Sequence, residues 1–342
     1  MRRHWRLLLP LALLAAAIVL VIWRGPDWGL VHDAFSAVTW EWVAAAIGLN
    51  LLSVLTRAFA WDTAIKQSIA PPHPRFPLVF SAFSVGLFAN AVLPGRVGEL
   101  ARVAVLRRRL IGRKGTTATL VGSVFAHRMF DLFPALALVV WVLLSAKIPH
   151  WALTSIAIVF VVGVTFFLTA VFLAYRQRRE LEELGRIRAL LVRVRQGLAI
   201  MRSPVAAGTA ASFQFAGWVC QLFAVWAAME AFDIHLPISA AGLVLVLMNV
   251  ATIFPLWPGN FGLVQIAVAF PLTNYNVAYA HGVAFGIGLQ AIEASVGVGV
   301  GLVFLAREGL SYATLRDIEE SPDNGDEDVV TERRDDRARV AG

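Results

Sequence analysis

The sequence predicts an all-α, polytopic membrane protein. Its 342 residues are 58% hydrophobic and only 15% charged, and the mean hydropathy is +0.69. Soluble domains carry roughly 25% charged residues. Apolar runs recur along the chain at the length of about 20 residues that crosses a bilayer's hydrocarbon core. This composition excludes an ordinary soluble domain.

Six of these runs are expected to cross the membrane completely. The first follows a basic start, as a signal peptide would, but no small-residue cleavage site follows it, so we expect a retained span. The six expected spans are residues 7–23, 40–56, 116–145, 151–175, 205–232 and 277–306.

Two shorter runs, 76–93 and 238–254, end in the same kind of helix breaker. The sequences are Pro-Gly-Arg-Val-Gly and Pro-Gly-Asn-Phe-Gly, and they begin 164 positions apart. Matching Pro and Gly interruptions in the two halves of a membrane chain are typical of broken helices around a central binding site. The predicted breaker residues are Pro94, Gly95, Gly98, Pro258, Gly259 and Gly262.

Positive charge orients the runs, because short cytoplasmic loops keep an excess of Lys and Arg. Residues 57–75 and 96–114 are both basic, so both flanks of the run 76–93 are expected inside the cell. Both flanks of the run 238–254 are nearly uncharged and are expected outside. A re-entrant hairpin at each breaker satisfies both conditions, whereas a single crossing does not.

The predicted architecture is therefore six full spans plus two re-entrant hairpins, arranged as inverted halves of about 40–145 and 205–306. The alternative is eight plain spans, which would place the arginine-rich segment 176–204 outside. In the preferred topology that segment is an amphipathic cytoplasmic linker, and both chain ends are cytoplasmic. The transmembrane domain extends over residues 1–310, and the acidic segment 311–342 reads as a disordered cytoplasmic tail.

Charged residues near the first breaker and inside the spans are the candidate binding residues. Arg96, Glu99 and Arg102 follow one another at three-residue spacing, which brings side chains together on a helix. Arginine suits phosphate and carboxylate, so an anionic head group is a natural ligand. Charges within spans are costly and usually face a cavity or a partner. The remaining candidates are Arg128, Asp131, Glu293, Asn90, Asn260 and Gln265.

The sequence gives no reason to expect a cofactor, a metal site or a catalytic site. It contains no phosphate-binding loop, no zinc-ligand spacing and no nucleophile elbow, and Cys220 is the single cysteine. Its basic segments are interpreted as contacts with anionic lipid rather than with nucleic acid. A partner enzyme and a homo-oligomer both remain open.

The segment from Asn90 to Arg102 resembles the signature of the lysylphosphatidylglycerol synthase transmembrane-region family of flippase-like proteins. Arg57-x-x-x-Trp61, Arg128-x-x-Asp131 and the second breaker follow in the expected order. The resemblance covers roughly residues 5–310. Two acids typical of the family pattern are replaced here, by His127 and Gln265.

The resemblance implies movement of a lipid across the bacterial cytoplasmic (inner) membrane. The expected substrate is an anionic phospholipid, a glycolipid or a polyprenyl-linked lipid. Synthase activity is not expected, because only about 30 polar residues follow the last span. Two alternatives stay open: an ion-coupled secondary transporter of a soluble metabolite, and a non-transporting membrane subunit that docks a partner enzyme.

Overall fold

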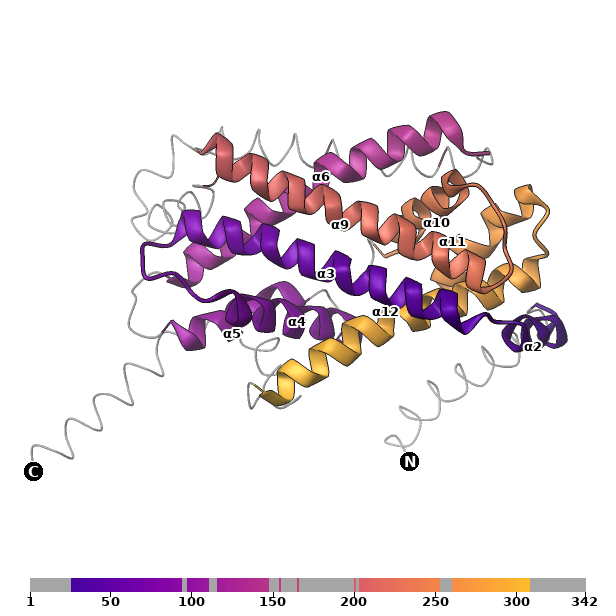
Figure 1. The fold of residues 1–342 in the computed structure, drawn as a ribbon, viewed down its shortest axis with the longest axis horizontal. Helices are drawn as coiled ribbons and strands as arrows, with labels where there is room; N and C mark the ends of the chain where they lie inside the picture. Colours follow the sequence, from indigo (N-terminus) through magenta and orange to yellow (C-terminus); the bar gives the residue numbers. More distant parts are fainter. Residues whose placement is uncertain are drawn as a thin grey trace, which may run out of the picture.

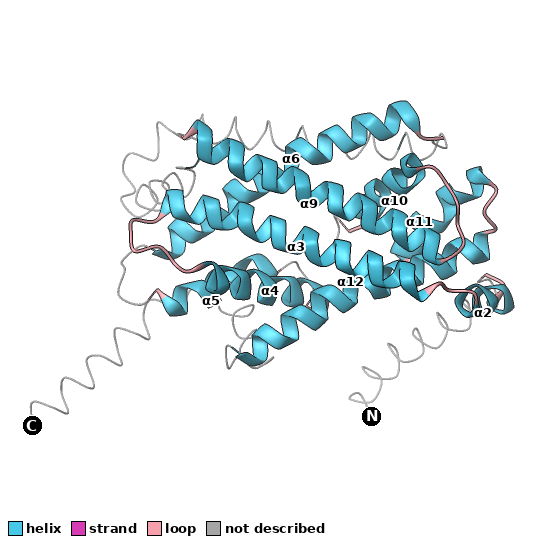
Figure 2. Ribbon diagram, viewed as in Figure 1, coloured by secondary structure: helices cyan, strands magenta, loops and turns pink. Residues whose placement is uncertain are grey.

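The computed structural model describes residues 26–93, 97–110, 116–147, 203–252 and 260–307, together with positions 154, 165 and 200. Within these residues the regular structure is entirely helical (Figures 1 and 2), which confirms the all-α prediction for this part of the chain. The helices are α2 (Trp28–Ser36), α3 (Trp40–Ser68), α4 (Phe76–Val92), α5 (Gly98–Arg109), α6 (Thr116–Ser145), α9 (Pro204–Ala231), α10 (Ile238–Ala251), α11 (Leu263–Leu272) and α12 (Tyr279–Arg307), with the 3₁₀ helix η6 (Thr273–Tyr275) after α11.

Four helices, α3, α6, α9 and α12, are long and apolar enough to cross a membrane. They contain 28 to 30 residues each, and at about 1.5 Å per residue they exceed the ~30 Å hydrocarbon core. They correspond to four of the six predicted spans. The runs 7–23 and 151–175, most of the linker 176–204 and the tail 311–342 lie outside the described residues.

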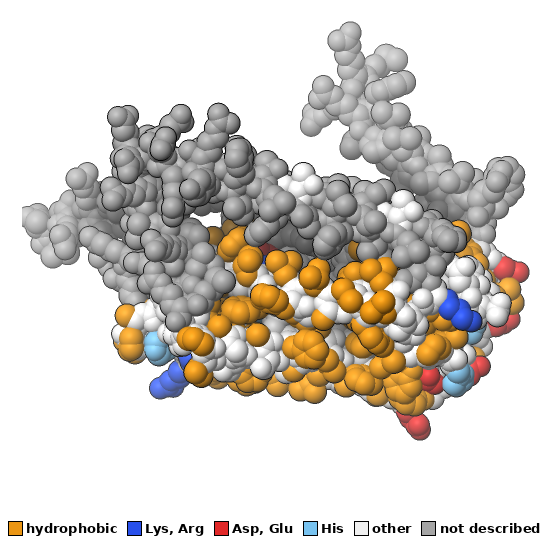
Figure 3. All heavy atoms as spheres, turned by 90° about the horizontal axis from the view of Figure 1, so that it is seen from above, with side chains coloured by type: hydrophobic (Ala, Val, Ile, Leu, Met, Phe, Trp, Pro, Cys, Tyr) orange, Lys and Arg blue, Asp and Glu red, His pale blue; other side chains and the backbone are white. Residues whose placement is uncertain are grey.

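The outer surface of the long helices is apolar. On α6 the side chains of Leu132, Leu136, Val140 and Leu144 recur every four residues and are 49% to 84% exposed. Figure 3 shows hydrophobic side chains across the middle of one face, with charged side chains toward the two ends of the long axis. Such a surface is suited to lipid rather than to water.

Two features differ from the sequence-based expectation. The second expected span, 40–56, was predicted to end at Thr56, but α3 continues to Ser68, so Arg57 lies within a helix instead of in a loop. This prediction was wrong because the charge of Arg57 is accommodated by neighbouring side chains inside the protein. Helix α2 was not predicted; the side chain of Asp27 caps it by accepting hydrogen bonds from the amides of Gly29 and Leu30.

Helices α4 and α5 form a tight antiparallel pair. The Asn90 side chain accepts a hydrogen bond from the Gly98 amide at 2.8 Å. Deeper in the pair, a Cβ atom built on Gly86 would lie 2.7 Å from the Gly98 carbonyl oxygen and 3.1 Å from Cβ of Arg102. With 17 and 12 residues, both helices are shorter than the four long ones. Residues 94–96 between them lie outside the described residues.

The four helices of the first half recur in the same order in the second half. Helices α9, α10, α11 and α12 begin 162 to 165 positions after α3, α4, α5 and α6, and the first pair, Trp40 and Pro204, is separated by 164. Asn260 hydrogen-bonds the Ala251 carbonyl at 3.0 Å and thereby joins the end of α10 to the start of α11. The spacing of the two breakers is thus also the spacing of the helices.

The matching helices α3 and α9 run in opposite directions. The amide of Thr39 donates to the carbonyl of Ala231 at one end, and the rings of Phe59 and Phe213 stack at the other. Midway, the Ser53 hydroxyl donates to the carbonyl of Gly217 at 2.7 Å, and these two positions are 164 apart. The two helices therefore cross at positions that are equivalent in the two halves of the chain. Such a crossing is what two equivalent helices of opposite direction require.

Candidate functional site

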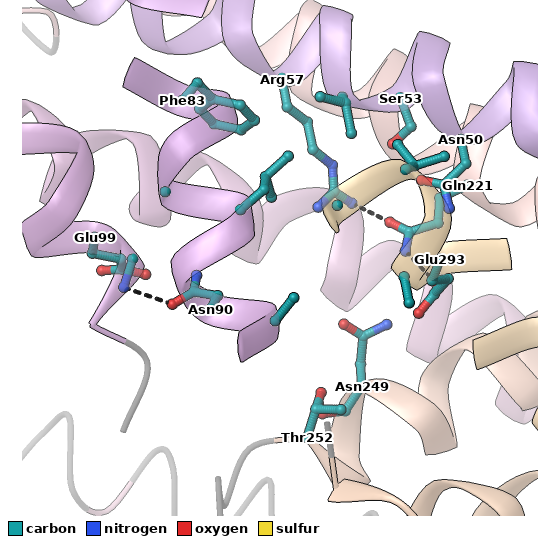
Figure 4. A pocket seen from close by; sticks show the side chains of 18 of the residues that line it. Asn50, Ser53, Arg57, Phe83, Asn90, Glu99, Gln221, Asn249, Thr252 and Glu293 are labelled. Atoms are coloured by element: carbon teal, nitrogen blue, oxygen red, sulfur yellow. Dashed lines mark hydrogen bonds between the residues drawn. The ribbon is translucent and has the colours of Figure 1, made fainter. Parts of the chain in front are cut away.

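A polar cavity of about 420 Å³ lies between the two sets of four helices (Figure 4). All eight of these helices contribute to its lining. Apolar residues of both hydrophobic cores border it, among them Phe83 and Val296 on one side and Met248 and Val264 on the other. Charged side chains at such a place need partners, because burial removes their hydration.

A short ion pair joins α5 to α6. Glu99 accepts from Nε and Nη2 of Arg128 at 2.6 and 2.5 Å through one carboxylate oxygen. Nη1 of the same guanidinium lies 3.1 Å from Oδ2 of Asp131, one helical turn further along α6. Arg128 therefore bridges two carboxylates, and the edge of its guanidinium formed by Nε and Nη2 is fully occupied by Glu99.

Asp131 extends this contact to α9. Its second oxygen accepts from the indole of Trp218 at 3.0 Å and from the amide of Gln214. The carboxylate of Asp131 is only 14% exposed, so these donors replace the water that it loses. A single aspartate thus connects the first half of the chain to the second.

A second chain of contacts crosses the cavity from α3 to α12. Nη2 of Arg57 donates to the Gln221 carbonyl oxygen at 2.6 Å, and the amide group of Gln221 donates to Glu293 at 3.3 Å. Figure 4 shows the three side chains in line. The guanidinium of Arg57 also lies 5.2 Å from the ring of Trp218. Gln221 therefore links a cation and an anion of opposite halves.

Arg102 is held differently from the other two arginines. It is 4% exposed, and its guanidinium carbon lies 4.7 Å from the centroid of Trp61 and 5.6 Å from that of Phe83. Within the described residues its Nε and Nη2 have no hydrogen-bond partner. Aromatic rings thus fix the side chain while one edge of the cation stays unoccupied.

The second half presents neutral polar groups to the same cavity. Asn249 and Thr252 rise from the end of α10 toward Glu293 (Figure 4), and Asn260 and Gln290 also line the space. Among the described residues that line the cavity, charged side chains come from α3, α5 and α6 and, in the second half, from Glu293. The cavity has one ionic wall and one amide-rich wall.

The structure brings most of the predicted residues together. Those that line the cavity are Asn90, Gly98, Glu99, Arg102, Arg128, Asp131, Asn260 and Glu293. Arg96, Pro94, Gly95, Pro258 and Gly259 lie outside the described residues. Gly262 caps α11 with φ of 92°, a backbone conformation that favours glycine.

Two details differ from the expected contacts. Glu99 was expected to join its neighbours along the chain, but its partner is Arg128 of the next helix. Gln265 does not line the cavity: its side chain accepts from the Gly262 amide and donates to Gln290, both at 2.5 Å. Gln265 therefore shapes the start of α11 and positions Gln290.

Sequence reasoning did not select Arg57 and Gln221 as site residues. The sequence does contain a signal for this pair: the two positions are separated by 164 residues, the same spacing as the two breakers, and are therefore equivalent positions of the internal repeat. Counterparts near the crossing of α3 and α9 must lie close together. His127 was also not selected; it is 2% exposed, lines the cavity and packs edge-on against Phe83.

The arrangement is suited to binding a polar ligand. Within the described residues no group of three His, Cys, Asp or Glu side chains could hold a metal ion. What the cavity offers is cationic, anionic and amide groups, enclosed by helices with apolar outer surfaces. These features define a multi-pass helical membrane protein with a charged internal cavity.

The chain belongs to the family described as the lysylphosphatidylglycerol synthase TM region, whose family model matches residues 7–301. The expected resemblance is thereby confirmed. No curated protein and no solved structure matches the chain significantly. The family and the apolar helices together indicate a membrane protein related to lipid metabolism or lipid translocation.

Proposed function

We propose that this protein moves lipids across the bacterial cytoplasmic membrane by admitting their head groups to the cavity between its two halves. The observation that carries this proposal is the cavity itself, a charged space of about 420 Å³ lined by the four long apolar helices and by the four shorter ones. Charges at membrane depth are costly and mark the paths of polar substrates. A head group crossing the bilayer requires such a polar route.

The helix lengths support a re-entrant arrangement of α4–α5 and of α10–α11. Each of these four helices has 17 residues or fewer, and a span needs about 20. Helix ends at membrane depth leave backbone groups unsatisfied unless they line a polar cavity. We infer that both pairs enter from opposite faces and meet the cavity with their broken ends, as in other inverted repeats.

Orientation follows from the ends of the spans. At one end of α3 lie Trp40 and Trp42, which are exposed, and at the other end lies Lys66. Aromatic residues are enriched at both membrane interfaces, and positive charge is enriched on the cytoplasmic side. This favours a cytoplasmic location for the end of α3 and for the basic end of α5, with both chain termini on the same side.

The proposed activity involves no covalent change of the lipid. The chain contains no nucleotide-binding motif, so movement is either passive or coupled to an ion. Glu99 and Asp131 hold Arg128 at the junction of α5, α6 and α9. A head group that competes for these charges would loosen the junction, which gives lipid entry a route into the cavity.

Leaflet exchange in proteoliposomes tests this proposal. The purified full-length protein is reconstituted with fluorescent head-group-labelled lipids, anionic and zwitterionic, and dithionite quenching follows their exchange between leaflets. We expect exchange by the wild-type protein and a loss of tenfold or more in Glu99→Gln. The matched control is Glu41→Gln, which neutralises an exposed carboxylate in the first turn of α3.

Each outcome has a defined meaning. Absence of exchange for every lipid would overturn the translocase proposal and direct attention to a soluble substrate or to docking of a partner enzyme. Exchange that is equal in the wild type and in Glu99→Gln would remove the ionic junction from the mechanism. Equal losses in Glu99→Gln and Glu41→Gln would indicate a general effect of charge rather than a cavity site.

A further inference from the structure

The carboxylates that line the cavity differ in how their negative charge is compensated. Glu99 and Asp131 both form ion pairs with Arg128. Glu293 on α12 has a single hydrogen-bond donor within the described residues, the neutral amide group of Gln221 at 3.3 Å. The negative charge of Glu293 is therefore the least compensated of the three.

The groups packed around α12 do not neutralise Glu293. Helices α4 and α11 contain no ionisable side chain, and α2 contributes only His32 and Asp33, which are exposed. Arg57 of α3 attracts the carboxylate, but its Nη2 donates to the carbonyl oxygen of Gln221 on α9 instead. The other ionisable side chains that line the cavity lie on α5 and α6, namely Glu99, Arg102, His127, Arg128 and Asp131.

Glu293 is open to the cavity and lies at membrane depth. It occupies the middle of α12, which extends from Tyr279 to Arg307 and is long enough to cross the membrane. Its side chain is half-buried rather than enclosed, and it lines the same space as Asn249 and Thr252 of α10 (Figure 4). An uncompensated carboxylate at this depth is costly, and the uptake of a proton from cavity water removes the charge.

We propose that Glu293 binds and releases one proton in each transport cycle and thereby couples lipid movement to the proton gradient across the membrane. This inference rests on the proposed function and adds its driving force. On the proton-rich side a hydronium ion transfers its proton to the carboxylate, which forms one O–H bond on Glu293 and leaves one water molecule. The reverse transfer to water restores the carboxylate on the other side. Glu99 and Asp131 remain in their ion pairs with Arg128, so one proton moves per cycle.

Protonation of Glu293 also changes a contact between helices. As a carboxylate, Glu293 accepts from the amide group of Gln221, whose own carbonyl oxygen is occupied by Arg57. The neutral carboxyl group loses the attraction to Arg57. Its bond with Gln221 also loses the charge assistance that makes such a bond roughly twice as strong. Proton uptake therefore holds α12 less firmly to α3 and α9, on either side of the cavity.

A pH gradient across proteoliposomes tests the coupling. The full-length protein is reconstituted with phosphatidylethanolamine labelled with a fluorophore on its amine, which leaves no group that titrates near neutral pH. Potassium and valinomycin hold the membrane potential at zero, and dithionite quenching measures the label in each leaflet. With one proton per lipid, a gradient of about one pH unit shifts the ratio of label between the leaflets by up to about tenfold. Exchange with a ratio that ignores the gradient would overturn the coupling and retain translocation.

Three variants assign the coupling to one side chain. Glu293→Gln keeps the shape but binds no proton, so we expect exchange without accumulation in either leaflet. Glu293→Asp keeps a carboxyl group, and its accumulation should lie between those of the wild type and Glu293→Gln. Glu41→Gln is the matched control, since Glu41 is exposed in the first turn of α3, and it should accumulate label as the wild type does. Undiminished accumulation in Glu293→Gln would overturn the proposal, as would equal losses in Glu293→Gln and Glu41→Gln.

Infrared spectroscopy tests the proton site without lipid transport. The C=O stretch of a protonated carboxyl group lies apart from the amide bands, and ordinary carboxyl groups are ionised above about pH 5. We expect a protonated-carboxyl band above this pH in the wild type and in Glu41→Gln, and its loss in Glu293→Gln. This band in a protein that exchanges no lipid would retain the proton site and reject translocation. Absence of a Glu293-dependent band would overturn the proposal, as would accumulation that follows a sodium gradient instead of a pH gradient.

Discussion

Replacing Gly98 by alanine tests the close approach of α4 and α5. A methyl group on Gly98 would lie 2.6 Å from both Cγ and Oδ1 of Asn90 and would overlap the carbonyl oxygen of Gly86. Ordinary contacts of this kind begin at 3.4 Å, so the helices would have to separate locally. Because one obstacle is backbone, a change of rotamer cannot relieve the contact.

The expected loss of stability is about 2–4 kcal/mol. Overpacking of this kind costs roughly 1–3 kcal/mol, and separation also weakens the bond between Asn90 and the Gly98 amide, worth about 1 kcal/mol. Gly48→Ala is the matched control, since nothing lies within 4 Å of a Cβ atom there. That change should be neutral or stabilise the helix by up to about 1 kcal/mol.

Thermal unfolding of the purified variants in detergent is the assay. A loss of about 2–4 kcal/mol corresponds to a midpoint lowered by roughly 3–6 °C in a protein of this size. The double variant Gly86→Ala/Gly98→Ala should lose less stability than the two single variants together, because either methyl group alone already separates the same two helices. Gly98→Ala unfolding at the temperature of Gly48→Ala would refute the packing argument.

Three other substitutions probe separate contacts. Gln221→Leu removes the group between Arg57 and Glu293, so we expect a loss of about 1–3 kcal/mol in thermal unfolding and slower lipid exchange; unchanged values for both would show that the link is dispensable. Gly262→Ala meets no neighbouring atom but must adopt φ of 92°, which costs about 1–3 kcal/mol in backbone strain, measurable as a lower unfolding midpoint. Asn90→Leu removes the side-chain oxygen that accepts from the Gly98 amide at the start of α5, and it should lower the stability by about 1–2 kcal/mol. An unfolding midpoint equal to that of the wild type would mean that the Gly98 amide finds another acceptor.

The helices were largely predictable from the sequence because each has a local signal. Hydrophobic length identified α6, α9 and α12 to within about two residues, and Pro and Gly marked the ends of α4 and α10. The end of α3 was misplaced because charge was taken as a sign of a loop. Arg57 is tolerated inside a helix only through Gln221 and Trp218, which lie more than 160 positions further along the chain.

The residues that line the cavity were predicted better than the contacts that these residues make with one another. Glu99 and Arg102 could be selected from their spacing after the first breaker, and Arg128 and Asp131 could be selected because charges inside an apolar run usually face a polar interior. Spacing along one helix suggested that Glu99 joins Arg102, whereas the structure pairs it with Arg128 across helices. Partner choice depends on how helices pack, and a single sequence does not contain that information.

The difference between the ionic wall and the amide-rich wall affects the balance between an inward-open and an outward-open form of the protein. In an inverted pair, the inward-open form of one half has the shape of the outward-open form of the other. Identical copies would give both forms the same free energy. Here Arg102 and Arg128 have Ile266 and Ile292 as their counterparts at the 164-residue spacing, so any two such forms differ in energy. A free-energy difference of only 1.4 kcal/mol would make one form about ten times more populated than the other. The ligand-free protein would then open mainly to one side of the membrane.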